Sequence, residues 1–168
     1  MNIASPEPAT RRRTSTSHIE IRLAKPGDET KLVDLLELFF SLSAWKGAMR
    51  FHRDKTLLHL TGVLAMGRAP YIMALDGDEL VGVCSYHIWS SCTDPIAVLD
   101  ECFVLPRLRR TDLGRRLIFL ALHLAKGDGC VAFHFPIASG MPAQNSLMNM
   151  VGRHFGAEYI GTIFRKVL

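Results

Sequence analysis

The chain has 168 residues, of which 48% are hydrophobic and 21% are charged, and its formal net charge is +4. This composition is typical of one folded globular domain and excludes a disordered or low-complexity chain. No apolar run approaches the roughly 20 residues that a membrane-spanning helix needs, so we expect no membrane partner. The modest positive charge suits an anionic ligand.

The first 17 residues are rich in Pro, Ser and Thr and carry an arginine triplet at residues 11–13. This pattern predicts a disordered basic tail over residues 1–17 and one domain over residues 18–168. The tail lacks the apolar segment of a secretory signal, so we expect a cytoplasmic protein. A basic tail can also contact nucleic acid, but we interpret it as a solubilising charge run and expect no nucleic-acid partner.

The four cysteines lack the paired spacing of a zinc site, although His134 lies near Cys130. We therefore predict no metal. Free cysteines in apolar segments act as small hydrophobes, which fits a reducing cytoplasm. The cysteines are Cys84, Cys92, Cys102 and Cys130.

A strand and two helices are expected first. Apolar and polar residues alternate over residues 19–23, as in a half-buried strand. Asp28 is placed to cap a first helix, and Asp54 is placed to open a second one that Gly67 ends. The apolar stripe of the first helix has the spacing i, i+3, i+4, i+7 and consists of Leu32, Leu35, Leu36 and Phe39.

Strands and helices alternate in the rest of the chain. Apolar runs at residues 71–75 and 80–89 flank an Asp-Gly turn, which indicates a hairpin. A strand is expected at residues 97–104, followed by a helix with the apolar stripe Leu113, Leu117, Leu120, Ala121 and Leu124. The last expected elements are a strand at 130–135, a helix at 145–155 and a strand at 159–164. The predicted order is β-α-α-β-β-β-α-β-α-β.

The turn between the strand at residues 97–104 and the helix from Leu113 is the most informative segment. N–H groups at a helix start have no acceptor within the helix, and the macrodipole adds partial positive charge there. A strand, a basic turn and a helix start together predict a phosphate or pyrophosphate site. The turn and first helical turn contain Arg109, Arg110, Arg115 and Arg116.

This segment resembles the acyl-CoA signature of the GCN5-related N-acetyltransferases (GNAT), Gln/Arg-x-x-Gly-x-Gly/Ala after a strand that ends in Val-x-Pro. Val104-Leu105-Pro106 matches the strand end. Arg109-Arg110-Thr111-Asp112-Leu113-Gly114 covers the loop, with Asp112 in place of the first glycine. The family often carries an Asn eleven residues before a Gly-aromatic pair, and Asn145 stands eleven residues before Gly156.

The resemblance implies an α+β domain of the GNAT fold, with a mixed, mostly antiparallel central sheet flanked by helices in the order given above. It implies an enzyme that moves an acetyl group from acetyl-CoA, as co-substrate, to a primary amine of a small molecule or protein. The pantetheine arm would pair with backbone groups where the fourth and fifth strands splay apart, and the pyrophosphate would lie on the following turn. The residues expected to bind CoA are Phe103, Val104, Leu105, Arg109, Arg110, Thr111, Asp112, Leu113, Gly114, Arg115 and Asn145.

Acetyl transfer requires a base that deprotonates the acceptor amine. Glu101 is the leading candidate because it lies on the motif strand just before the pantetheine segment, where desolvation would raise the pKa of a carboxyl. His87 is the alternative base. The neighbouring Asp100 is expected to face the opposite side of the sheet.

Gly152 replaces the tyrosine that the family uses as general acid, so Tyr86, Cys102 or water would take that role. The resemblance also implies that residues 41–53, between the first two helices, select the acceptor. Two other functions stay open: a non-catalytic module with this fold, which Asp112 and Gly152 favour, and a nucleic-acid adaptor that uses the basic tail. A homodimer is left open as well.

Overall fold

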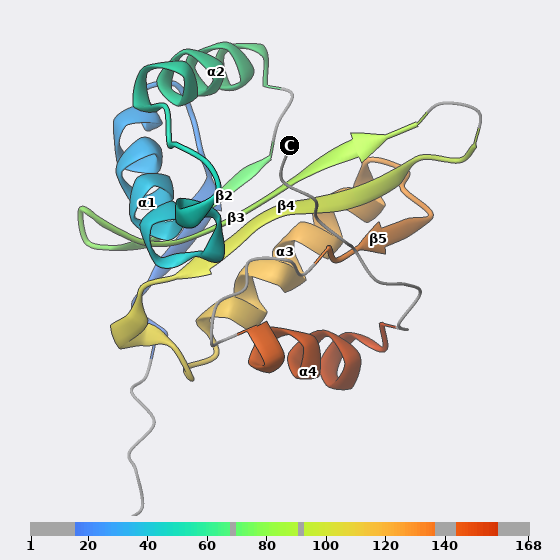
Figure 1. Cartoon of the computed structure of the whole chain (residues 1–168). Coiled ribbons are helices and arrows are strands. Elements are labelled where there is room, and N and C mark those ends of the chain that lie inside the picture. Colours follow the sequence, from blue (N-terminus) through green and yellow to red (C-terminus); the bar gives the residue numbers. More distant parts are fainter. Residues whose placement is uncertain (1–15, 68–69, 91–92, 137–143, 158–168) are drawn as a thin grey trace, which may run out of the picture.

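The computed structural model describes residues 16–67, 70–90, 93–136 and 144–157, with the side chains of residues 144–149 left aside. Its strands are β1 (Glu20–Leu23), β2 (Tyr71–Asp76), β3 (Glu79–Trp89), β4 (Ile96–Val104) and β5 (Ala132–His134). Within these residues the strands form one sheet in the order β1-β2-β3-β4-β5 (Figure 1). The first four are antiparallel neighbours, and β5 is parallel to β4.

The helices are α1 (Glu29–Leu42), α2 (Arg53–Met66), α3 (Leu113–Gly127) and α4 (Gln144–Phe155), with short 3-10 helices at Ala44–Gly47 and Pro106–Leu108. Figure 1 shows α1 and α2 on one face of the sheet and α3, with α4 beside it, on the other. On the α1 face, the rings of Phe39 and Phe103 lie 5.4 Å apart. On the α3 face, a Cβ at Gly82 would lie 3.2 Å from Leu117 Cδ1, so a residue without a side chain lets α3 approach the sheet.

The helix α2 ends at the predicted glycine, and apolar side chains lie on the buried side of both α2 and α3. Gly67 adopts φ +63° at the end of α2, where glycine has no steric penalty. Leu60 and Leu64 are the buried residues of that helix. The buried side of α3 consists of Leu113, Leu117, Ile118, Ala121 and Ala125.

The predicted mixed, mostly antiparallel sheet flanked by helices is confirmed, and the described elements follow the predicted order. β5 is shorter than the predicted strand at 130–135. The strand predicted at 159–164 and the tail at 1–15 lie outside the described residues, whereas Thr16, which the sequence placed in the tail, is buried. No helix in the described ranges is long and apolar enough to cross a membrane.

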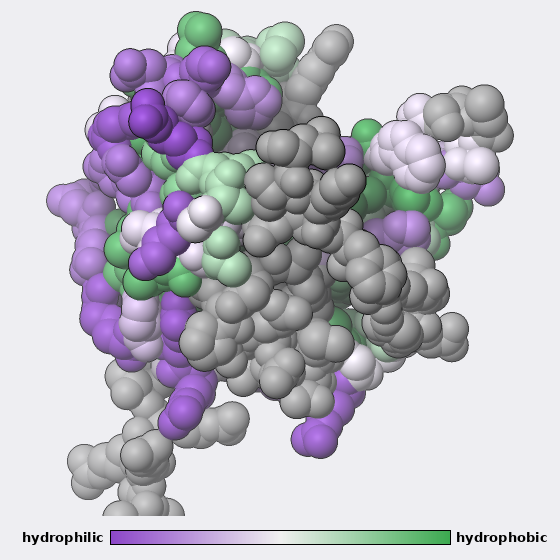
Figure 2. All heavy atoms as spheres, in the orientation of Figure 1, coloured by the Kyte–Doolittle hydropathy of each residue, from purple (hydrophilic) through white to green (hydrophobic). Residues whose placement is uncertain are grey.

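Polar contacts join the two helices on one face. Arg53 at the start of α2 lies 2.5 Å from the carboxylate of Asp34 and 2.8 Å from that of Glu37, both in α1. Figure 2 shows hydrophilic side chains gathered over α1 and α2 on the side that it displays. These contacts join the start of α2 to α1.

Asp28 occupies the N-cap position of α1, as predicted, but its carboxylate makes no capping hydrogen bond within the described structure. It accepts two hydrogen bonds from Arg22 of β1, at 2.7 and 2.9 Å, and one from the Lys25 N–H. The hydrogen bond from Arg22 is the main reason why the pKa of Asp28 is lowered. This carboxylate therefore ties β1 to the start of α1.

We expect Asp28→Ala to lower the free energy of unfolding at neutral pH by about 2 kcal/mol, because it removes charge-assisted hydrogen bonds. A carboxyl with a lowered pKa stabilises the fold above its unfolded pKa, and that contribution is lost as pH falls through the folded value. The difference between parent and variant should therefore shrink on acidification. Denaturant unfolding over a pH series measures it, with Asp54→Ala at the exposed start of α2 as the control.

Candidate functional site

The strand β4 has an open edge. β5 pairs with it at residues 96–98, and no strand of the described chain continues along residues 99–104. On the other side, Leu105 donates its N–H to the Val81 carbonyl at 2.9 Å, and the Phe103 carbonyl lies beside Gly82. Because backbone groups of a strand alternate between its two neighbours, Val104 directs its own groups to the open edge.

The three residues expected to pair with pantetheine are therefore not equivalent. Val104 directs its backbone groups to the open edge, and so does Cys102, two residues earlier, which was not among the predicted residues. The N–H of Leu105 and the carbonyl of Phe103 face β3 instead. The spacing of the motif predicted the position of this edge. The strand register decides which residues direct their backbone N–H and carbonyl groups toward it.

Arg109 folds back over the end of this edge. Its Nε lies 3.4 Å from the Val104 carbonyl, and its guanidinium carbon lies 5.6 Å from the centroid of the Phe103 ring. Its Nη2 atom is buried without a hydrogen-bond partner in the described structure. Leaving a buried charged donor unsatisfied costs about 1–3 kcal/mol or more.

A β-bulge brings two carboxylates to one face of the sheet. Ser85 pairs with Glu101 and Tyr86 pairs with Leu99, which leaves Asp100 as the extra residue of β4. The Ser85 hydroxyl donates to the Glu101 carboxylate, and His87 Nδ1 lies 2.6 Å from Asp100 Oδ1.

Ser85 and His87 are two residues apart on β3, so they face the same side, and their partners must do so too. The expectation that Asp100 faces away from Glu101 is therefore wrong, because the bulge turns it. This shared face is the one covered by α1, since Phe103, two residues after Glu101, contacts Phe39 there.

Glu101 is half-buried, and burial is the main reason why its pKa is raised. The charge on Asp100 raises the pKa further, whereas the hydrogen bond from Ser85 and the charge on His87 lower it. Tyr71 of β2 pairs with Ser85 and is 8% exposed. Burial, followed by the charges on Glu101 and Asp100, raises the pKa of the Tyr71 hydroxyl.

The sequence did not identify Tyr71 as a site residue, because it begins an apolar run that predicts only a buried strand. Its place beside Glu101 follows from pairing across three strands: Tyr71 with Ser85, and Ser85 with Glu101. The site on this face thus consists of Tyr71, Ser85, His87, Asp100 and Glu101.

The two side chains suggested as general acid lie on the other face. The Tyr86 hydroxyl donates to Asp128 at 3.0 Å, just after α3, and Tyr86 is 1% exposed. Cys102 pairs with Cys84 across the strands, and the two thiols interact. Neither side chain lies beside Glu101 in this arrangement.

The turn before α3, where the sequence predicts an anion site, is held by local contacts. Arg110 adopts φ +69°, a left-handed conformation that is uncommon outside glycine. The Thr111 hydroxyl donates to the Leu108 carbonyl at 2.7 Å and accepts from the Leu113 N–H at 3.3 Å. The Leu113 side chain is fully buried, so its contribution to the site is limited to the backbone.

Among the described residues, the amides of Gly114 and Arg115 at the start of α3 have no hydrogen-bond partner, whereas the Arg116 N–H already bonds to the Asp112 carbonyl at 3.0 Å. A Cβ at Gly114 would lie 3.9 Å from Val104, so the helix start is next to the open edge of β4. Asn145 lies in the first turn of α4, and its side chain is outside the described part of the structure.

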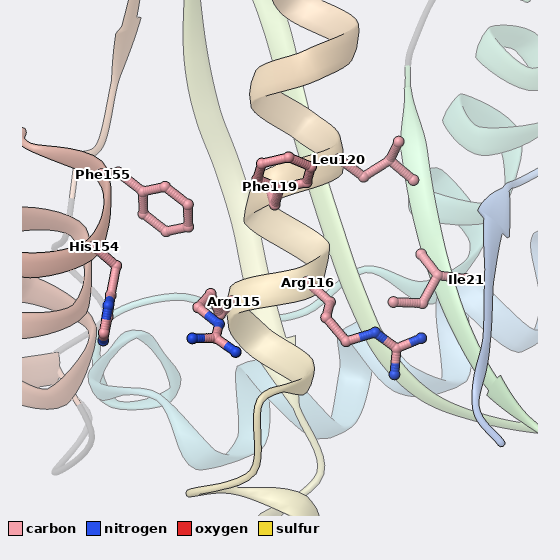
Figure 3. Close-up of a pocket in the computed structure, with 7 residues that line it drawn as sticks. All are labelled: Ile21, Arg115, Arg116, Phe119, Leu120, His154 and Phe155. Atoms are coloured by element: carbon pink, nitrogen blue, oxygen red, sulfur yellow. The ribbon is translucent and has the colours of Figure 1, made fainter. Parts of the chain in front are cut away.

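A pocket of about 440 Å³ lies over the outer side of the same helix start (Figure 3). Figure 3 shows Arg115 pointing toward α4, where His154 and Phe155 lie, and Arg116 pointing the other way, toward β1. Phe119 is 66% exposed, which is unusual for a large aromatic side chain. The lining residues are Ile21, Arg115, Arg116, Phe119, Leu120, His154 and Phe155.

The model of the acetyltransferase (GNAT) family matches residues 32–146, which run from the first turn of α1 to the start of α4. The chain belongs to this family. The expectation that it is an enzyme, an acyl-CoA-dependent acetyltransferase, is confirmed by this membership.

Solved structures with this GNAT fold are similar over nearly the whole chain. One is an aminoglycoside acetyltransferase from an uncultured soil metagenomic sample in complex with sisomicin, with TM-score 0.69, 18% identity, and coverage of 90% of this chain and 97% of that one. Another is the aminoglycoside N-acetyltransferase AAC(6′)-Iy in complex with CoA, with TM-score 0.67, 21% identity, and coverage of 89% and 94%. A third is an acetyltransferase of Trypanosoma brucei, with TM-score 0.66, 17% identity, and coverage of 89% and 99%. No curated protein matches the sequence.

The raised pKa of Glu101 predicts a pH-dependent cost to stability. The fold favours the neutral carboxyl, so its contribution is most favourable below the ordinary pKa and is lost as pH rises through the raised value. We expect Glu101→Gln, which can still accept from Ser85, to raise Tm by about 3 °C at about pH 8 and to change it little at about pH 4. Glu20→Gln at an exposed site is the control, and an equal gain in both variants would contradict the assignment.

Proposed function

We propose that this GNAT acetyltransferase transfers an acetyl group from acetyl-CoA to a primary amine, with Glu101 as the base. The observation that carries the proposal is the half-buried Glu101 on a bulge beside the open edge of β4. Three neighbouring features divide the co-substrate between them. The open edge takes the pantetheine arm, the Gly114 and Arg115 amides take the pyrophosphate, and the bulge lies at the thioester end.

The geometry suits a direct transfer. The amine nitrogen attacks the thioester carbonyl carbon, the C–S bond breaks, and CoA leaves as a thiolate. The proton of the amine passes to Glu101, directly or through a water, and the raised pKa of Glu101 makes it a better base. A thiolate leaves without full protonation near neutral pH, so the reaction does not depend on a tyrosine at position 152.

The acceptor is proposed to carry more than one amino group. Asp100 and Glu101 face the same side, and Asp100 is 36% exposed, so one carboxylate is available to bind a second ammonium. His87 contacts the Asp100 carboxylate in this structure, and the second ammonium group of the acceptor would replace that contact. The sisomicin complex of the soil acetyltransferase, which shares the fold, is consistent with such an acceptor.

The pocket of Figure 3 is proposed to hold the adenosine end of CoA, because it starts within the helical turn that offers the pyrophosphate amides. Arg115 and His154 suit the 3′-phosphate, and the exposed ring of Phe119 suits the adenine base. One turn of helix spans about 5.4 Å, so the 3′-phosphate and the adenine base can lie in this pocket while the pyrophosphate contacts the amides at the helix start.

We expect Glu101→Gln to lower kcat by about 10³-fold, within the usual worth of a general base. CoA affinity should change little, because the pantetheine contacts are backbone groups. In the parent the rate should rise with pH through the raised pKa of Glu101, and this limb should disappear in the variant. Steady-state rates over a pH series with a panel of diamines and monoamines measure this.

His87→Ala is the control and should lower kcat a few-fold only. CoA binding with no turnover of any amine by the parent would contradict the proposed acceptor class.

We expect CoA and acetyl-CoA to raise Tm alike, and dephospho-CoA, which lacks the 3′-phosphate, to bind about tenfold more weakly than CoA. Arg115→Ala should weaken CoA binding and leave dephospho-CoA binding nearly unchanged, so that the two affinities converge. Isothermal titration of both ligands measures the ratio, with Lys126→Ala at the far end of α3 as the control. An undiminished ratio in Arg115→Ala would place the adenosine elsewhere.

A further inference from the structure

The segment before β1 is fastened to the start of α3. Thr16 is 3% exposed, and its hydroxyl donates a hydrogen bond to the carboxylate of Asp112. Arg116 donates to the Thr16 carbonyl at 2.6 Å and to the Ile19 carbonyl at 3.1 Å. In Figure 3, Arg116 accordingly points away from Arg115 and toward β1. These contacts join parts of the chain nearly a hundred residues apart.

Without these contacts, the Asp112 carboxylate would hinder the binding of a phosphate at the start of α3. It stands at the N-cap position of α3, and an aspartate there normally accepts a hydrogen bond from the second or third amide of the helix. In α3 those amides belong to Gly114 and Arg115, which are the ones available to a pyrophosphate. A carboxylate on them would both occupy the donors and repel the ligand.

The carboxylate of Asp112 makes no such capping bond in the described structure. The hydrogen bond from Thr16 is the main cause of its lowered pKa, and the charge on Arg116 contributes, so Asp112 is ionised at neutral pH. Its negative charge is thus directed toward Thr16 and Arg116 instead of toward the helix amides.

We propose that Thr16 is a positioning residue for CoA binding: it holds the Asp112 carboxylate off the Gly114 and Arg115 amides and so leaves them for the pyrophosphate. The proposal rests on the CoA site proposed above. It also explains how this chain keeps an anion site with aspartate at a position where the family motif has glycine.

A double-mutant cycle tests this by isothermal titration of CoA into the parent, Thr16→Val, Asp112→Ala and the double variant. Alanine tolerates the φ of −84° found at position 112 and cannot cap the helix. We expect Thr16→Val to weaken CoA binding about tenfold, equivalent to about 1.4 kcal/mol, because the released carboxylate turns to the amides. In the Asp112→Ala background the same substitution should have less than about a twofold effect.

A purely structural tether would behave differently. It would make Thr16→Val equally harmful in both backgrounds, and that result overturns the proposal, as does unchanged CoA affinity in Thr16→Val alone. Thr16→Ser keeps the hydroxyl and should bind CoA like the parent. Thr16→Ala repeats the cycle if the valine variant does not fold, as judged by circular dichroism. CoA binding by the parent and by Asp112→Ala tests the proposed function separately, since neither measurement depends on Thr16.

Discussion

The open edge of β4 is the constraint from which the candidate site follows. On one side β4 is paired with β3 along its whole length, and on the other β5 covers three residues in the described structure. Unpaired backbone donors and acceptors at a sheet edge are ready to pair with another extended chain. The close approach of α3, made possible by Gly82, brings the free amides of Gly114 and Arg115 to the end of this edge. An extended arm with a phosphate end is the ligand that fits both features.

The bulge at Asp100 gives the site its acid–base character. Without it, neighbouring residues on β4 would face opposite sides of the sheet, and a single carboxylate would face the α1 side. With it, two carboxylates share that face, and each has its own partner on β3. Burial raises the pKa of Glu101, whereas Asp100 stays at the more exposed rim beside His87. Two acidic groups on one face of the sheet thus have different environments.

The helix start shows how a change in a motif residue is accommodated elsewhere in the fold. Asp112 adds a negative charge to a turn whose other charged side chains are arginines. The fold keeps that charge and directs the Asp112 carboxylate toward Thr16, in the segment before β1. Arg116 of α3 donates to the Thr16 carbonyl and supplies a positive charge nearby. Arg116 consequently points toward β1 and Arg115 toward α4, and both arginines line the pocket. Two neighbouring arginines therefore have different surroundings because they lie on different sides of one helix.

The sequence by itself determined the order of the elements, since apolar spacing depends on which face of a helix or strand is buried. It also predicted an anion site at residues 104–114, because the glycine and the arginines of the motif lie close together in the chain. It did not determine the bulge, the placement of Tyr71 and Glu101 on either side of Ser85, or the contact of Thr16 with Asp112. Register and bulges belong to pairs of strands, and contacts between residues nearly a hundred positions apart depend on how α3 packs on the sheet. No local pattern contains that information, so tertiary packing alone decided which charges meet.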